Sequence, residues 1–218
     1  PKYNFSKENF PHMSFKNINF MGVDCRVMRI SFTGEMCYEI NIPSSYAKSL
    51  WKKCFELGKK FNITPYGTEA MHVLRAEKGF IIVGQETDGS VTPIDLDMSW
   101  IVNNNKYDFI GKRALYRSDT ARSDRKQLVG ILTTNPDEVL EEGAQLVEKI
   151  TSLPMKMVGH VTSSYYSPNL GRSFALALVK EGIKKKGMKI FAPMPNKNVQ
   201  VEITNPVFVD PNNDRLRS

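Results

Sequence analysis

The sequence predicts an α+β protein in which a mixed segment of strands and helices is followed by a small six-stranded antiparallel β-barrel. The two strongest amphipathic helix patterns lie within the first 120 of the 218 residues. From Lys126 onward, short strand patterns follow one another, separated by Gly, Pro and Asn, with no long helical pattern between them. Many short strands with turns between them are typical of a barrel. We therefore predict two domains, residues 1–120 and residues 121–218.

The first strands lie around the segment RISFTGEMCYEI, residues 29–40. Apolar residues alternate before and after Thr33–Glu35, so two strands joined by a turn at these three residues are predicted. Glu39 interrupts the second strand with a carboxylate. It either points to solvent or lines a concave surface that binds a polar ligand, and the residue pattern alone favours solvent because Glu is rarely buried unless it is paired.

Two helices follow. After Pro43–Ser45, a natural helix start, the helical spacing of apolar residues predicts an amphipathic helix with a buried aromatic stripe. The residues of this pattern are Ala47, Leu50, Trp51, Cys54 and Phe55. A second helix is predicted from Thr68 to a stop at Gly79. Two shorter helices are predicted after Thr92, which resembles an N-cap followed by proline, and in DFIGKRAL at residues 108–115.

The barrel prediction depends on six strand patterns after residue 125. They are QLVGILTT, AQLVEK, MVGHVTSSYY, SFALALV, KIFAP and VQVEIT. Each is five to ten residues long and rich in Val, Ile, Leu, Thr or aromatic residues, as strands are. No internal repeat is evident.

The net charge and its distribution along the sequence indicate which classes of partner to expect. The chain carries +7, with dense positive runs at residues 122–126 and 182–189. Nucleic-acid-binding modules usually add a stacking or groove-reading motif, and this sequence has none, so a solvated basic surface is favoured. A basic rim would also attract an acidic small molecule or subunit. We expect no nucleic-acid partner, and no membrane partner either, because no run of about 18 apolar residues occurs.

Cysteine and histidine usage indicates neither disulfides nor a metal. An odd number of cysteines without C-x-x-C predicts reduced core thiols in a cytoplasmic protein, and the histidines are too scattered for a zinc site. The cysteines are Cys25, Cys37 and Cys54, and the histidines are His12, His72 and His160. The first residues lack the features of a secretion signal. Because the sequence starts at proline and enters a strand pattern almost at once, we expect it to be part of a longer protein.

Catalytic motifs are scarce. The sequence lacks G-x-S-x-G, H-E-x-x-H, G-x-G-x-x-G and the P-loop pattern. Glu69 and His72 are neighbours on the predicted helix, but such a pair is more often a structural contact than a catalytic dyad. Composition and spacing alone therefore indicate a mixed domain followed by a barrel, and no reaction.

A resemblance carries the interpretation further. In order along residues 10–211, the sequence contains SFTGEMCYEINIP, NITPYGTEAMHVLRAEKG, VGQETDGSVTPIDLDMSW, FIGKRAL, GHVTSSYYSPNLGRSFALALV and VEITNPVFVDP. This succession resembles the folate-binding region of the glycine-cleavage aminomethyltransferase (T-protein) family. More closely, it resembles the sarcosine oxidase branch, at the C-terminal part of the α subunit of the heterotetrameric enzyme.

The resemblance implies roles for four residues in a folate-binding domain. Glu39 matches the glutamate that accepts hydrogen bonds from the pterin, whose adjacent N–H donors suit a carboxylate. Phe32 stands where many members have tyrosine, so it offers apolar or stacking contact without a phenol hydroxyl. Arg75 either holds the pocket or pairs with Glu77 or another buried carboxylate. Met71 replaces an arginine that faces the ligand elsewhere in the family.

The resemblance also implies the reaction and the missing parts. Sarcosine would be oxidatively demethylated to glycine, with its one-carbon unit captured by tetrahydrofolate as 5,10-methylenetetrahydrofolate and hydrogen peroxide formed from oxygen. FMN, FAD and NAD are expected elsewhere in a full complex with β, γ and δ subunits. The family's catalytic aspartate is expected upstream of this sequence, so no catalytic residue is assigned here. The chain by itself is expected to be inactive.

Two alternatives remain open. The chain could be part of a stand-alone folate-dependent aminomethyl or methyl transferase of the T-protein type. It could also be a non-catalytic binding module that uses its basic surface, in which case RNA retention would depend on salt and not on folate.

Overall fold

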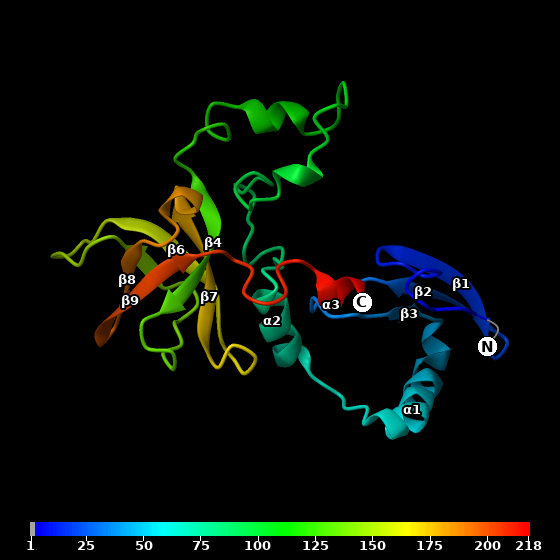
Figure 1. The fold of residues 1–218 in the computed structure, drawn as a ribbon. Helices are drawn as coiled ribbons and strands as arrows, with labels where there is room; N and C mark the ends of the chain where they lie inside the picture. Colours follow the sequence, from blue (N-terminus) through cyan, green and yellow to red (C-terminus); the bar gives the residue numbers. More distant parts are fainter. Residues whose placement is uncertain (1–2) are drawn as a thin grey trace. The chain divides into compact units, whose positions relative to one another are not determined.

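The computed structural model describes residues 3–218, which form two compact units (Figure 1). One unit extends up to Arg75 and also contains Asp210–Ser218; the other is Ala76–Val209. The predicted α+β class with a six-stranded antiparallel barrel is confirmed. The predicted domains, residues 1–120 and 121–218, stay a prediction, because compact units and sequence domains need not share a boundary.

The first unit is built on a three-stranded antiparallel sheet in the order β1 (Ser14–Phe20), β2 (Val23–Arg29) and β3 (Glu39–Asn41). Met21 and Gly22 join β1 to β2, with φ of 53° and 85°. Two successive positive φ values match the right-handed twist of a tight hairpin. The turn fixes the register, which places Ile18 opposite Cys25.

The pleat of this sheet separates two kinds of side chain. Cys25, Val27 and Arg29 are buried and alternate along β2 with residues that are exposed or half-buried. On the other face Arg26 lies between Asn17 of β1 and Asn41 of β3. Because successive side chains of a strand point to opposite faces, one face is largely apolar and the other is polar. The predicted strand pair around Glu39 therefore forms, although β3 is only three residues long.

Helix α1 (Ala47–Gly58) follows the 3₁₀ turn η1 (Ser44–Tyr46), and η2 (Lys59–Phe61) continues it. The helix is confirmed, but the predicted buried aromatic stripe is wrong. No residue of α1 is buried, and Trp51, whose ring lies 4.9 Å from that of Phe55, is 61% exposed. The physical reason is that Leu50, Cys54 and Leu57 face the sheet across an open apolar groove of about 450 Å³ instead of closing onto it.

Helix α2 spans Thr68–Glu77. It ends as predicted at Gly79, whose φ of 72° is a left-handed conformation that glycine adopts without strain.

The predicted helix after Thr92 is wrong. The side chains of Thr92 and Asp95 each accept a hydrogen bond from the backbone N–H of the other residue, as in a capping box. Turns follow instead of a helix. The remaining short elements are the 3₁₀ turns η3 (Ser99–Ile101) and η4 (Lys112–Tyr116) and helix α3 (Asp214–Arg217). Of the predicted helix at residues 108–115, only η4 forms.

The second unit contains the barrel. Its strands close in the order β4-β7-β6-β5-β8-β9, and every pair is antiparallel. The strands are β4 (Lys126–Thr133), β5 (Gln145–Val147), β6 (Met157–Ser167), β7 (Arg172–Lys180), β8 (Lys189–Met194) and β9 (Lys197–Thr204), with the 3₁₀ turn η5 (Gly182–Lys185) after β7. All six coincide with the strand patterns in the sequence. Closure leaves no free edge, which removes the usual route to strand-by-strand aggregation.

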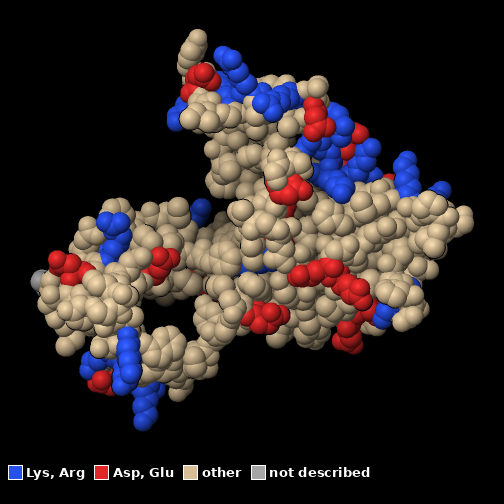
Figure 2. All heavy atoms as spheres, turned by 180° about the vertical axis from the view of Figure 1, so that it is seen from behind, with Lys and Arg blue, Asp and Glu red and all other residues tan. Residues whose placement is uncertain are grey.

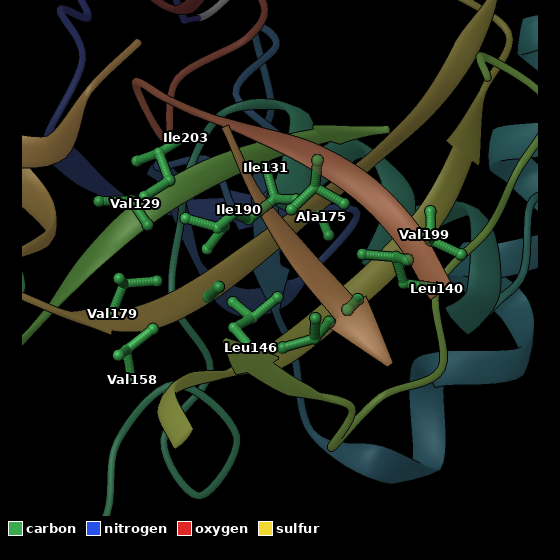
Figure 3. Packing of buried hydrophobic residues seen from close by; sticks show 14 residues of the cluster. Val129, Ile131, Leu140, Leu146, Val158, Ala175, Val179, Ile190, Val199 and Ile203 are labelled. Atoms are coloured by element: carbon green, nitrogen blue, oxygen red, sulfur yellow. The ribbon is translucent and has the colours of Figure 1, made fainter. Parts of the chain in front are cut away.

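Aliphatic side chains fill the barrel interior (Figure 3). The cluster consists of Val129, Ile131, Leu140, Leu146, Val158, Val161, Ala175, Ala177, Val179, Ile190, Ala192, Val199, Val201 and Ile203. Each large aliphatic side chain of this kind contributes about 1.5–3 kcal/mol when fully removed from water. The barrel is therefore a packed core and not a channel.

A buried ion pair fastens the segment before the barrel to its first strand. Arg125 donates from Nε to Oδ1 of Asp95 at 2.9 Å and from Nη2 to Oδ2 at 2.9 Å. A third bond runs from Nη1 to the exposed carboxylate of Asp119 at 2.8 Å, and the N–H of Leu128 donates to the carbonyl of Asp95 at 2.8 Å. Hydrogen bonds to the Asp95 carboxylate raise the pKa of Arg125, so its guanidinium stays charged.

Gly130 in β4 has no room for a side chain. A Cβ there would lie within 3.0 Å of backbone atoms of Asn205, which cannot move aside as a flexible side chain can. We expect Gly130→Ala to lower the free energy of unfolding by roughly 1–3 kcal/mol. Gly89→Ala, which meets nothing within 4 Å, should change it by less than about 0.5 kcal/mol. Urea denaturation compares the two, and equal effects would contradict the close packing of β4.

The two carboxylates that bind Arg125 should differ in their contribution to stability. Asp95→Asn leaves a nearly buried guanidinium without its bidentate partner and should cost about 2 kcal/mol. Asp119→Asn removes a partner whose side chain is 65% exposed, and should cost less than about 1 kcal/mol. Denaturant unfolding of the two variants checks this, and a larger loss for Asp119→Asn would be the opposite of our expectation.

Candidate functional site

Glu39 lies at the start of β3, opposite Met28, on the polar face of the three-stranded sheet. Its side chain is exposed, and Oε1 accepts a hydrogen bond from Nδ2 of Asn41 at 3.0 Å. Within residues 3–218, Oε2 has no hydrogen-bond partner. The carboxylate is thus oriented by a neighbour and keeps one oxygen open to a ligand.

Nine residues, and not the predicted three, connect β2 to β3. Within this loop, Gly34 has a φ of 83° and donates its N–H to Oγ of Ser31 at 3.0 Å, while Thr33 is buried. The predicted turn at Thr33–Glu35 is therefore part of a longer loop that folds back on itself. Phe32, on the same loop, is 40% exposed and offers an aromatic ring at the surface.

The two glutamates of this region have different environments. Glu35 accepts from Nη1 of Arg215 at 3.0 Å, which ties the loop to helix α3. Among the residues that the structure describes, Glu39 is bonded only by the side-chain amide of Asn41. Because the charge of Glu35 is already partly balanced by Arg215, Glu39 is the better ligand candidate of the two.

Arg29 supports this loop from the buried face of the sheet, and sequence reasoning missed it. Its guanidinium donates to the carbonyl of Phe10 at 2.8 Å and to the carbonyl of Ser218. It also lies 6.0 Å from the ring centre of Tyr38, at the end of the loop. The available signal was an arginine at an apolar position of an alternating strand, which indicates a buried and hydrogen-bonded charge.

The two predicted site residues on α2 are more enclosed. Arg75 is completely buried and Met71 is half-buried. Glu77, one candidate partner for Arg75, accepts hydrogen bonds from Oγ of Ser167 at 2.5 Å and Nδ2 of Asn169 at 2.8 Å. Burial of Arg75 suits a supporting role better than direct ligand contact. The roles of both α2 residues stay predictions.

A polar hollow of about 820 Å³ lies on the sheet face that carries Glu39. Its lining includes Asn17, Asn19, Asp24, Arg26, Met28 and Asn41. Glu39 adjoins it through its bond to Asn41 and its pairing with Met28. Sequence reasoning did not find these residues, because alternating polar residues on a strand usually mark an ordinary solvated face.

The remaining candidates for a functional site are metal-binding groups, cysteines, histidines and apolar helices of the described residues. Residues 3–218 contain no group of three or more His, Cys, Asp or Glu arranged for a metal, and the cysteines are free thiols. Burial and the charge of Arg29 lower the pKa of His12, and burial and Lys126 lower that of His160, so both favour the neutral form. Over the same residues, no helix is long and apolar enough to cross a membrane.

The positive charge is divided among several places. On the face in Figure 2, Lys and Arg side chains form separate groups with Asp and Glu side chains near them. Nucleic-acid-binding surfaces usually present a continuous basic patch or stripe. The distribution on this face fits the expected solvated surface.

Comparison with known protein families finds two matching domains, in the same order as the predicted mixed segment and barrel. Residues 1–106 match the GCVT N-terminal domain, and residues 126–210 match the glycine cleavage T-protein C-terminal barrel domain. The chain belongs to the glycine cleavage T-protein family. The resemblance identified from the sequence is thereby confirmed, and the second match coincides with the six-stranded barrel.

Among curated proteins, the chain is similar to sarcosine oxidase α subunits. It is 48% identical over 96% of its length to the subunit of Corynebacterium sp. strain P-1, and 36% identical over 95% to that of Rhizobium meliloti. It spans 22% and 21% of those proteins. It is also 31% identical over 90% of its length to the aminomethyltransferase of Thermoanaerobacter pseudethanolicus, of which it spans 51%.

A solved structure supports the assignment of the fold. The crystal structure of the glycine cleavage system aminomethyltransferase T from Bartonella henselae aligns with a TM-score of 0.74 at 26% identity. The alignment covers 85% of this T-protein family chain and 50% of that protein. The chain thus spans about half of the aminomethyltransferases and about a fifth of the sarcosine oxidase subunits that it matches.

Proposed function

We propose that this chain is the tetrahydrofolate-binding part of an enzyme of the sarcosine oxidase type. The observation that carries the proposal is the open Oε2 of Glu39 on the polar sheet face. Support for the sarcosine oxidase branch comes from 48% identity over 96% of the chain to such an α subunit, against 31% to an aminomethyltransferase.

The residues present fit a reduced folate. The amino-pyrimidine edge of a pterin carries adjacent N–H donors, and an exposed carboxylate with a free oxygen accepts from them. Hydrogen bonds to a charged group contribute about 1.5–3 kcal/mol net. The ring of Phe32, 40% exposed on the loop between β2 and β3, is available for an apolar or stacking contact. Asn41 holds the Glu39 carboxylate in place before the ligand arrives.

The proposed overall reaction is the oxidation of sarcosine to glycine, with oxygen reduced to hydrogen peroxide and the one-carbon unit transferred to tetrahydrofolate. When bound, tetrahydrofolate supplies the nucleophilic nitrogens that take up this unit. The residues of this chain bind and orient the acceptor, which raises its effective concentration where the one-carbon unit is released. Catalytic residues, the flavin and NAD sites, and the β, γ and δ partner subunits belong to the remainder of the proposed complex.

A stand-alone aminomethyltransferase is the second candidate. Its support is the alignment with the Bartonella henselae aminomethyltransferase and the 31% identity to other aminomethyltransferases. The two functions differ in their need for oxygen. If the complete purified protein forms peroxide from sarcosine, the oxidase is supported, whereas folate-dependent aminomethyl transfer without oxygen uptake supports the transferase.

We expect Glu39→Ala, made in the complete natural protein that carries this sequence, to weaken tetrahydrofolate binding at least about tenfold, or about 1.4 kcal/mol. Glu39→Gln should be almost as harmful, because one acceptor oxygen becomes a donor that faces donors. Calorimetric titration with tetrahydrofolate measures both.

Glu35→Gln is the matched control for this experiment, since Glu35 lies near Glu39 in sequence but is already bonded to Arg215. The tetrahydrofolate affinity of the Glu35→Gln variant should remain within about twofold of that of the unmodified protein. Unchanged affinity in both Glu39 variants would remove this residue from the site and with it the proposed folate contact.

A further inference from the structure

Arg26 offers an unused anion-binding group on the same sheet face as Glu39. Its Nε donates to Oδ1 of Asn17 at 3.0 Å, and its guanidinium lies 5.0 Å from the ring centre of Phe15. Among the described residues, neither terminal nitrogen of Arg26 has a hydrogen-bond or ion-pair partner. Four N–H donors of an always-charged group therefore remain open to the polar hollow.

The guanidinium is also held in place. The bond to Asn17 fixes Nε, and the ring of Phe15 supports the planar group from one side. Because an exposed arginine otherwise samples many rotamers, two such contacts reduce the entropy lost when an anion binds. The outer edge of the guanidinium suits a carboxylate, which two parallel N–H groups bind together.

Register places Arg26 and Glu39 within reach of one ligand. Arg26 pairs with Asn41, and Glu39 lies two residues before Asn41 on β3. Diagonal neighbours of this kind have Cα atoms about 7–8 Å apart, and their side chains leave the sheet on the same face. A ligand lying across β2 and β3 can meet an acceptor at Glu39 and a donor at Arg26.

Asp24 sets a limit on this site. It lies two residues before Arg26 on the same face, and its Oδ1 accepts from Nδ2 of Asn19 at 2.8 Å. Its negative charge disfavours an anion on that side of Arg26. The remaining approach lies toward Asn41 and Glu39.

We propose that Arg26 binds the anionic end of the ligand whose donor edge Glu39 accepts, so that the polar sheet face is a two-point site. This inference rests on the proposed folate function. For a reduced folate, the group that Arg26 binds is a carboxylate of the glutamyl tail. Asn17 is a positioning residue, because it acts through the orientation of Arg26.

The test compares two ligands on the complete natural protein by calorimetry: tetrahydrofolate, and a tetrahydropterin that lacks the aminobenzoyl-glutamate tail. Arg26→Gln should weaken tetrahydrofolate binding about tenfold and change tetrahydropterin binding less than about twofold. Glu39→Gln should weaken both ligands. Asp24→Asn should strengthen tetrahydrofolate binding, and this gain should shrink as salt is raised.

Arg113→Gln is the matched control, since Arg113 belongs to η4 in the other compact unit; neither affinity should change. Arg26→Lys, which keeps the charge but not the planar fork, should give an intermediate loss of tetrahydrofolate affinity. Thermal unfolding checks that all variants fold.

If Arg26→Gln affects the binding of both ligands equally, or of neither, the proposed anion site is wrong, while a loss of affinity in Glu39→Gln still supports the folate contact. If no variant changes either affinity, the proposed function fails as well.

Discussion

The antiparallel register of β2 with β3 is the constraint on which the candidate site depends. It places Glu39 opposite Met28 and Asn41 opposite Arg26, so that the carboxylate and the guanidinium share a face. A shift of one residue would turn Glu39 toward the apolar side and place Ile40 on the polar face instead. Such a shift is disfavoured because the alternate residues Cys25, Val27 and Arg29 are buried on the opposite face. Burial of the apolar face therefore determines which side chains the polar face presents to a ligand.

Arg29 connects this sheet to distant parts of the sequence. Its guanidinium bonds to carbonyl groups near both ends of the described chain, and its own carbonyl accepts the N–H of Met13. An arginine in this position acts as a framework group, because two backbone carbonyls share one buried charge. The interior of the barrel is held differently, by aliphatic packing within a closed hydrogen-bonded sheet.

The barrel was predictable from sequence because its strands are locally consistent: apolar, β-branched and bounded by turn residues. Glu39 and Phe32 emerged as candidates only through the family resemblance, since a glutamate in a strand is usually solvated. The buried stripe on α1 was predicted wrongly because periodicity reports that a helix has an apolar side and not whether anything closes over it. Arg26 was missed for a related reason: only the register reveals that Asn17 and Phe15 hold its guanidinium on the sheet face that also carries Glu39.

The first compact unit is discontinuous, because Asp210–Ser218 belong to it while Ala76–Val209 form the second unit. On a ribosome, which adds about 5–20 residues per second, the first unit must wait on the order of ten seconds for its last segment. During that interval the barrel can already close, whereas the sheet lacks the contacts of Arg29 and Glu35 with the C-terminal segment. The order of completion thus differs from the order in which the units begin: the inserted unit is complete before the unit that carries Glu39.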